Sequence, residues 1–117
     1  KTNNKGIALK EKTMEKTIFI VKEEKSFNYN GLYRFGTNIV PVRKFDIKKN
    51  STDSARDKLG IEKVLRDFNY KEDYLMLSGC PITTFACGAI LAANVPYVNT
   101  LTWDNRNKLY VPGRWDF

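Results

Sequence analysis

Short β-branched runs and longer stretches with helical spacing follow one another along this chain. Residues 17–21, Thr-Ile-Phe-Ile-Val, lie between charged residues and predict a short buried strand. Residues 38–42 predict a second strand, in which Pro41 favours an edge position because proline lacks the N–H that a central strand needs. The intervening residues 26–36 are rich in Asn, Gly and Tyr, so they predict a loop or a short helical turn.

The middle of the chain predicts an amphipathic helix and then a buried strand. Residues 50–53 offer several N-cap side chains, and apolar residues recur behind them at mostly helical spacing, at Ala55, Leu59, Val64, Leu65 and Phe68. We therefore expect a helix over about 53–68, weakened by Gly60. Residues 74–77 form a nearly continuous apolar run, which is typical of a strand covered on both faces.

A tight turn and a second helix follow that strand. Ser78 and Gly79 favour the turn, and Pro81 suits the first position of a helix, where its missing N–H costs nothing. Residues 82–93 are apolar on almost every side, which predicts a central helix that is covered all round. On this interpretation the substitution Ala89→Asp would place an unpaired carboxylate in the core and cost several kcal/mol.

The end of the chain predicts a hairpin. Residues 98–103 and 108–111 flank a polar four-residue connection, and Pro112 with Gly113 predicts one more turn after them. The order of elements is then β-β-α-β-α-β-β. This order predicts a small single-domain α/β sandwich whose sheet has a mostly parallel centre and an antiparallel C-terminal hairpin.

Residues 1–13 differ in composition from the rest. They are polar and rich in lysine and asparagine, and Met14 stands directly before the first predicted strand. We interpret residues 1–13 as a translated leader that is not native to the protein or as a flexible basic arm, and residues 14–117 as a single α/β domain. No apolar run reaches the roughly 20 residues of a membrane helix, so we expect no membrane insertion.

One segment resembles a known group of proteins. The run Asp73-Tyr74-Leu75-Met76-Leu77-Ser78-Gly79, the alanine-rich stretch after it and the first predicted strand are similar to small bacteriophage proteins that share a D-Y-[IL]-x-x-[ST]-G strand and turn. The resemblance implies a phage origin and a compact α/β fold. Together with the expectation of reduced cysteines, it implies that the protein acts in the cytoplasm of an infected bacterium. It implies no activity and no functional residue.

Charge and residue usage limit the chemistry. The chain has a formal net charge of +7 and no histidine, which excludes histidine-based catalysis and imidazole zinc sites. Cys80 and Cys87 lie about 10 Å apart if one helix carries both, too far for a disulfide, so we expect free thiols. We see no acidic cluster for a metal and expect neither a metal nor a cofactor.

Two sets of residues are candidates for binding. The turn after the third predicted strand lies at a helix N-terminus, where backbone N–H groups and the helix dipole favour an anion or a nucleotide, at Ser78, Gly79, Cys80, Thr83 and Thr84. A second set mixes aromatic rings with guanidinium groups, as in protein-interface hot spots and base-stacking surfaces, at Tyr29, Tyr33, Arg34, Phe35, Trp103, Arg106, Arg114 and Trp115.

Three functions follow as hypotheses. The first is a non-enzymatic phage interaction protein, an adaptor or inhibitor that binds a host or phage protein, because no complete catalytic set accompanies the predicted core. The second is a nucleic-acid-binding accessory protein, suggested by the positive charge and the interleaved aromatic residues. The third is nucleotide or anion binding at the turn 78–84, although an ordinary β-to-α turn would have the same sequence.

Overall fold

The computed structural model describes residues 16–22, 29–43, 54–78 and 80–117. The predicted leader at 1–13 and Gly79 of the predicted anion site lie outside the described residues. These described residues form eight elements in chain order: β1 (Thr17–Lys22), the 3₁₀ turn η1 (Asn30–Arg34), β2 (Asn38–Arg43), α2 (Ser54–Leu65), β3 (Tyr74–Met76), α3 (Pro81–Asn94), β4 (Tyr97–Asp104) and β5 (Leu109–Asp116).

The strands form one mixed sheet in the order β2-β1-β3-β4-β5. The three pairs between β2 and β4 are parallel, and β4 pairs with β5 in the antiparallel sense. The predicted α/β fold with a parallel centre and an antiparallel C-terminal hairpin is therefore confirmed. β1 and β3 are neighbours at the centre of the sheet. The chain leaves β1 towards β2 on one side and leaves β3 towards β4 on the other side, so the boundary between β1 and β3 is a topological switch point.

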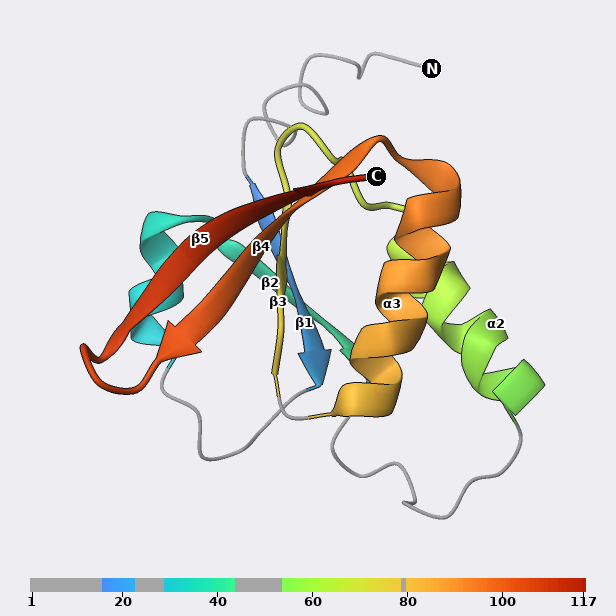
Figure 1. Ribbon diagram of the computed structural model, residues 1–117, viewed down its shortest axis with the longest axis horizontal. Helices are drawn as coiled ribbons and strands as arrows, with labels where there is room; N and C mark the ends of the chain where they lie inside the picture. Colours follow the sequence, from blue (N-terminus) through green and yellow to red (C-terminus); the bar gives the residue numbers. More distant parts are fainter. Residues whose placement is uncertain (1–15, 23–28, 44–53, 79) are drawn as a thin grey trace.

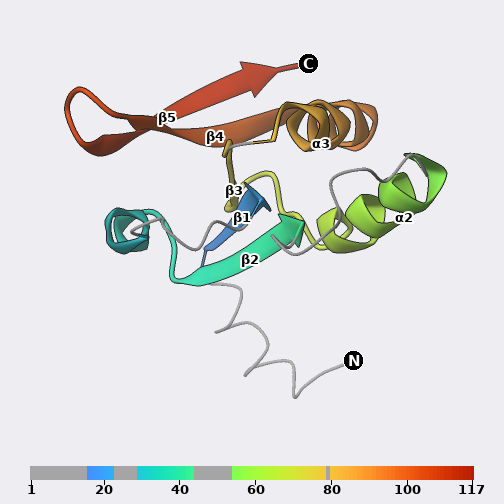
Figure 2. The same cartoon turned by 90° about the horizontal axis from the view of Figure 1, so that it is seen from below.

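The connections cover both faces of the sheet. Parallel crossovers are right-handed, so connections that run in opposite directions lie on opposite faces. Accordingly α2 and α3 pack side by side on one face, and η1 lies on the other (Figures 1 and 2). The helical face holds the larger core, which includes Phe19, Val21, Leu75, Cys87 and Leu91. The opposite face holds a smaller core of Ile18, Ile20, Leu32, Met76, Leu101 and Tyr110.

The two edge strands each contain a proline. Pro41 lies in β2 and confirms the predicted edge position. The turn predicted at Pro112 and Gly113 is wrong, because β5 continues through both residues to Asp116 and stays paired with β4. Pro112 is tolerated there because β5 is the outer strand, where a missing N–H leaves no central ladder bond unmade.

The prediction that α3 is central is also wrong. Its described buried side chains are Thr83, Cys87 and Leu91, which lie on one stripe, whereas Ile82 is 79% exposed and Phe85 78% exposed. Ala89 is exposed as well. The reason is the number of layers: the described elements place nothing outside α3, so its apolar outer side faces solvent (Figure 2).

Candidate interaction surface

The turn at the switch point is held by a buried serine. Ser78, which follows β3, is 4% exposed. Its hydroxyl accepts a hydrogen bond from the Lys22 N–H at 3.1 Å and donates to the Lys22 carbonyl at 2.9 Å. Both bonds join the end of β3 to the end of β1. The predicted ligand-binding hydroxyl of Ser78 is thus engaged within the protein.

The other end of β3 has a matching contact. Asp73 is 5% exposed and accepts hydrogen bonds from the Thr17 N–H at 2.9 Å and the Asn69 N–H at 2.8 Å. Burial raises the pKa of Asp73 above its ordinary value, and the two backbone N–H groups oppose that rise. Asp73 and Ser78 therefore fasten β3 to β1 at both ends. The segment that carries the phage resemblance therefore includes the two side chains that hold β3 against β1.

The remaining residues of the predicted anion site lie around the start of α3. Cys80 is the residue before the helix, and its Sγ lies 3.1 Å from the Oγ1 of the buried Thr83. Thr84 is half-buried and donates its N–H to the Cys80 carbonyl. The depression beside this turn is lined mainly by apolar groups, including Leu77, Pro81 and Phe85. Anion binding at this turn stays a prediction.

The aromatic and arginine set does not form one surface. Arg114 stacks on Tyr97, with its Cζ 3.6 Å from the ring centroid, and pairs with Asp116 at 3.0 Å. Trp115 pairs with Val98 and points to the helical side of the sheet, where it lines a groove beside α3. Arg106 lies in the exposed turn between β4 and β5.

Part of the same set does converge between η1 and the β4–β5 hairpin. A cleft of about 300 Å³ is lined by Gly31, Arg34, Trp103, Lys108, Leu109 and Tyr110. Trp103 is 41% exposed, and its ring packs edge-on against Tyr110 with centroids 4.8 Å apart. Arg34 comes from η1, at the opposite wall from the hairpin. We call this region the η1–hairpin cleft.

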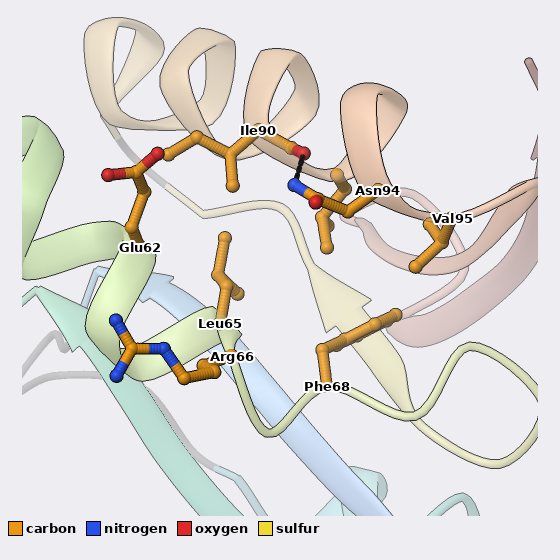
Figure 3. Close-up of a pocket in the computed structure, with 8 residues that line it drawn as sticks. Glu62, Leu65, Arg66, Phe68, Ile90, Asn94 and Val95 are labelled. Carbon is orange, nitrogen blue, oxygen red and sulfur yellow. Dashed lines mark hydrogen bonds between the residues drawn. The ribbon is translucent and has the colours of Figure 1, made fainter.

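A second hollow lies between α2 and α3. It has a volume of about 430 Å³, and Leu65 and Phe68 form its apolar side. Figure 3 shows Leu65 pointing towards α3, whereas the Arg66 side chain extends away from α3. The Asn94 amide donates to the Ile90 carbonyl at 2.7 Å. Glu62, Arg66 and Asn94 line the same hollow, so polar groups form a large part of its wall.

The comparisons place the chain among phage proteins. The protein-family model described as Phage Pam3 gp32-like protein matches residues 16–117. The chain belongs to this family. The phage resemblance of the strand-and-turn segment is thereby confirmed for this gp32-like protein. No curated protein and no solved structure matches it.

Sequence reasoning missed Lys108 and the outer side of α3 in the gp32-like protein. Lys108 has a left-handed backbone with φ of 56° and donates its Nζ to the Asn105 Oδ1 at 2.9 Å, which holds it at the rim of the cleft. The turn composition at 104–107 signals a hairpin, but nothing in it shows that η1 lies opposite. The exposed side of α3 could not be recognised from the sequence, because the buried side and the exposed side of this helix are both apolar.

Among the described residues, no three Cys, Asp or Glu side chains lie close enough together to hold a metal ion. No helix in the described ranges is long and apolar enough to cross a membrane. Burial raises the pKa of the Cys87 thiol to about 12, so this thiol stays protonated and unreactive.

Proposed function

We propose that this phage protein acts by binding another protein through the η1–hairpin cleft, and that the bound segment is acidic and carries an apolar or aromatic side chain. The observation that supports this proposal is the meeting of Arg34, Trp103 and Lys108 around one cleft. Tryptophan and arginine are the residues most enriched among interface positions that dominate binding energy.

The aromatic part of the cleft is held in place before a partner arrives. Trp103 rests against Tyr110, which is only 6% exposed and belongs to the smaller core. The Trp103 indole N–H also donates to Asn105 at 3.4 Å. A ring that is already ordered loses little conformational freedom on binding, so more of its contact energy appears as affinity.

The charges around the cleft determine the chemistry of the partner. Arg34 and Lys108 are both exposed and positive. The acidic group in the turn, Asp104, accepts hydrogen bonds from the backbone N–H of Arg106, the backbone N–H of Asn107 and the side-chain amide of Asn107. These bonds lower the pKa of Asp104 and tie it to the turn. Acidic side chains of a partner therefore meet Arg34 and Lys108 with complementary charge.

Selection from a random-peptide display library against the immobilised full chain tests the proposal. We expect the enriched sequences to combine Asp or Glu with an aromatic or large apolar residue. In fluorescence anisotropy, Trp103→Ala should weaken a selected peptide by about 30-fold, the size of a hot-spot truncation. Arg34→Glu and Lys108→Glu should each weaken it by about tenfold or more.

Two matched variants control for charge and for loss of an indole. Lys63→Glu makes the same charge change on the exposed side of α2, and Trp115→Ala removes the tryptophan on the other face of the hairpin. Both should leave peptide affinity unchanged. The proposal fails if no sequence is enriched, or if selected peptides bind the Arg34→Glu and Trp103→Ala variants as well as the parent.

Single-stranded nucleic acid is a second candidate for the same cleft. The exposed Trp103 ring shares a cleft with two cations, an arrangement on which a base can also stack beside its phosphate. Binding to labelled oligothymidylate should then fall steeply with added salt and be lost in Trp103→Ala. Oligothymidylate binding together with failure of peptide selection would replace the first function by this one.

A further inference from the structure

The outer side of α3 is an apolar stripe without a charged group. Ile82, Phe85, Ala89, Ala92 and Ala93 are all exposed, and their spacing of three and four residues places them on one side of the helix. The whole helix, Pro-Ile-Thr-Thr-Phe-Ala-Cys-Gly-Ala-Ile-Leu-Ala-Ala-Asn, contains no Asp, Glu, Lys or Arg. Helices on protein surfaces usually carry charge there, so this stripe is the signature of a covered surface.

The stripe has a gradient of side-chain size. Its N-terminal half presents the two large residues, Ile82 and Phe85, which are 79% and 78% exposed. Its C-terminal half presents only alanines, at 89, 92 and 93. A flat partner would leave gaps over the alanines. The best-fitting partner has small residues opposite Phe85 and large residues opposite the alanines.

A second copy of α3 in the antiparallel direction meets that requirement. Antiparallel pairing places Phe85 of each copy over the alanines of the other, and Ala89 lies close to the two-fold axis, where small residues allow the helices to approach closely. Parallel pairing would instead oppose large residues to large ones. We propose that this gp32-like protein forms a symmetric dimer through antiparallel contact of its two α3 helices.

Two aromatic residues extend this contact beyond the helix. Trp115 and Phe117 are 65% and 57% exposed and line a groove of about 160 Å³ together with Thr84 and Gly88 of α3. A 14-residue helix is about 20 Å long, so one side of it alone offers less area than the about 800 Å² per partner of a standard interface. Trp115 and Phe117 supply the additional apolar area beside the stripe.

The dimer surface is separate from the η1–hairpin cleft. Trp115 and Phe117 line the groove beside α3, whereas Arg34 and Trp103 line the cleft beside η1. Figure 1 shows α3 and η1 at opposite sides of the sheet. Dimerisation through α3 therefore does not depend on the function proposed for the cleft. Loss of one need not affect the other.

Sedimentation equilibrium of the full chain tests the dimer. The parent should show a reversible monomer–dimer equilibrium, and Phe85→Glu should weaken it by at least about 100-fold, because each dimer carries the change twice at a buried aromatic position. The matched control is Leu59→Glu, which makes the same type of change at an apolar residue that is 67% exposed on α2. Leu59→Glu should leave the dimer unchanged.

The antiparallel arrangement has its own test. In a Cys80→Ser background, Ala89→Cys places a thiol near the proposed axis, and mild oxidation should give a disulfide-linked dimer because disulfides need Cα atoms within about 7 Å. Cys87 is buried and stays out of the reaction. Lys63→Cys in the same background should not cross-link.

The possible results separate clearly. A monomer at every concentration overturns the proposal, as does a dimer that survives Phe85→Glu, or an open series of larger species. If Phe85→Glu is unfolded by circular dichroism, Ala92→Glu makes the same test in the small half of the stripe. A dimer that forms but does not cross-link at Ala89→Cys overturns the antiparallel arrangement.

Discussion

Asp73 and Ser78 show how single polar residues define the centre of this fold. Neither side chain reaches solvent to a useful extent, and each bonds to the backbone of β1 just beyond one end of β3. Buried polar groups with complete hydrogen bonds specify one register of strands, whereas apolar contacts alone allow several. The contribution of these residues is therefore to uniqueness as well as to stability.

Replacing Ser78 tests this role. Ser78→Ala removes the two hydrogen bonds that the buried hydroxyl makes to the Lys22 N–H and carbonyl, so we expect a loss of about 1–3 kcal/mol in the free energy of unfolding. Thr102→Ala removes a hydroxyl from an exposed position of β4 and should change it by less than about 0.5 kcal/mol. Urea unfolding of both variants gives the comparison, and equal stabilities would contradict the role assigned to Ser78.

Asp73 gives an unusual pH dependence. Because burial raises its pKa above the ordinary value of 3.8, the native state binds this proton more tightly than the unfolded state. The contribution of Asp73 to stability is thus full below the unfolded pKa and declines as the pH rises through the native pKa. The parent should lose stability relative to Asp73→Asn over that range. Carboxyl NMR should show a midpoint above 3.8; a lower midpoint would reverse the sign.

At the scale of elements, α3 combines one buried stripe with one exposed stripe. Apolar composition alone cannot distinguish a helix that is covered on all sides from a helix whose outer side is apolar and exposed. The helix itself, the strands and the edge position of Pro41 could be predicted from the sequence, because periodicity and proline chemistry are local. The orientation of α3 depends on how many layers form above it, which is a property of the whole chain.

The two stripes predict opposite responses to charge. Cys87→Asp buries a carboxylate among Phe19, Leu75 and Leu91 and should cost more than about 3 kcal/mol or prevent folding. Ala89→Asp lies on the exposed stripe and, in dilute solution, should change the free energy of unfolding by less than about 1 kcal/mol. Thermal melts of the two variants make the comparison. A strongly destabilised Ala89→Asp would show that α3 is covered on its outer side after all.

Glycines in the connecting elements differ in the same way. A Cβ on Gly36 would lie 2.7 Å from the Lys16 carbonyl oxygen, which accepts hydrogen bonds from the Thr37 and Asn38 N–H groups. Gly36→Ala must therefore displace the start of β2 and should destabilise the fold by about 1–3 kcal/mol. A Cβ on Gly60 in α2 meets nothing within 4 Å. Gly60→Ala should therefore increase the free energy of unfolding by as much as about 1 kcal/mol. Chemical denaturation should show the two changes with opposite signs.

At the scale of the whole molecule, the sheet separates two surfaces of different chemistry. The cleft could be predicted in part, because Trp103 and Arg34 are conspicuous residue types. Strand pairing brings Trp103 close to Arg34 and places Trp115 on the other face of the sheet. Neither position could be predicted from composition. A dimer through α3 would carry one cleft on each outer side.

Salt should act on the two surfaces in opposite directions. Each copy has a net charge of +7, so dimerisation brings like charges together while the charge-free stripe forms the contact. Added salt screens that repulsion and should strengthen the dimer, but it should weaken an acidic peptide at the cleft. Sedimentation and anisotropy between about 50 mM and about 500 mM salt measure both effects. A dimer weakened by salt would indicate a charged contact elsewhere.

The prolines of the two outer strands have a consequence for how copies of this protein can accumulate. A sheet with a long open edge can add strands from neighbouring molecules without limit, and this is the route to fibrils. Pro41 in β2 and Pro112 in β5 each remove an N–H from an outer strand, so neither border offers a complete row of donors. Crowded copies can associate through their faces and close, whereas growth along the hydrogen-bonding direction is disfavoured at both borders.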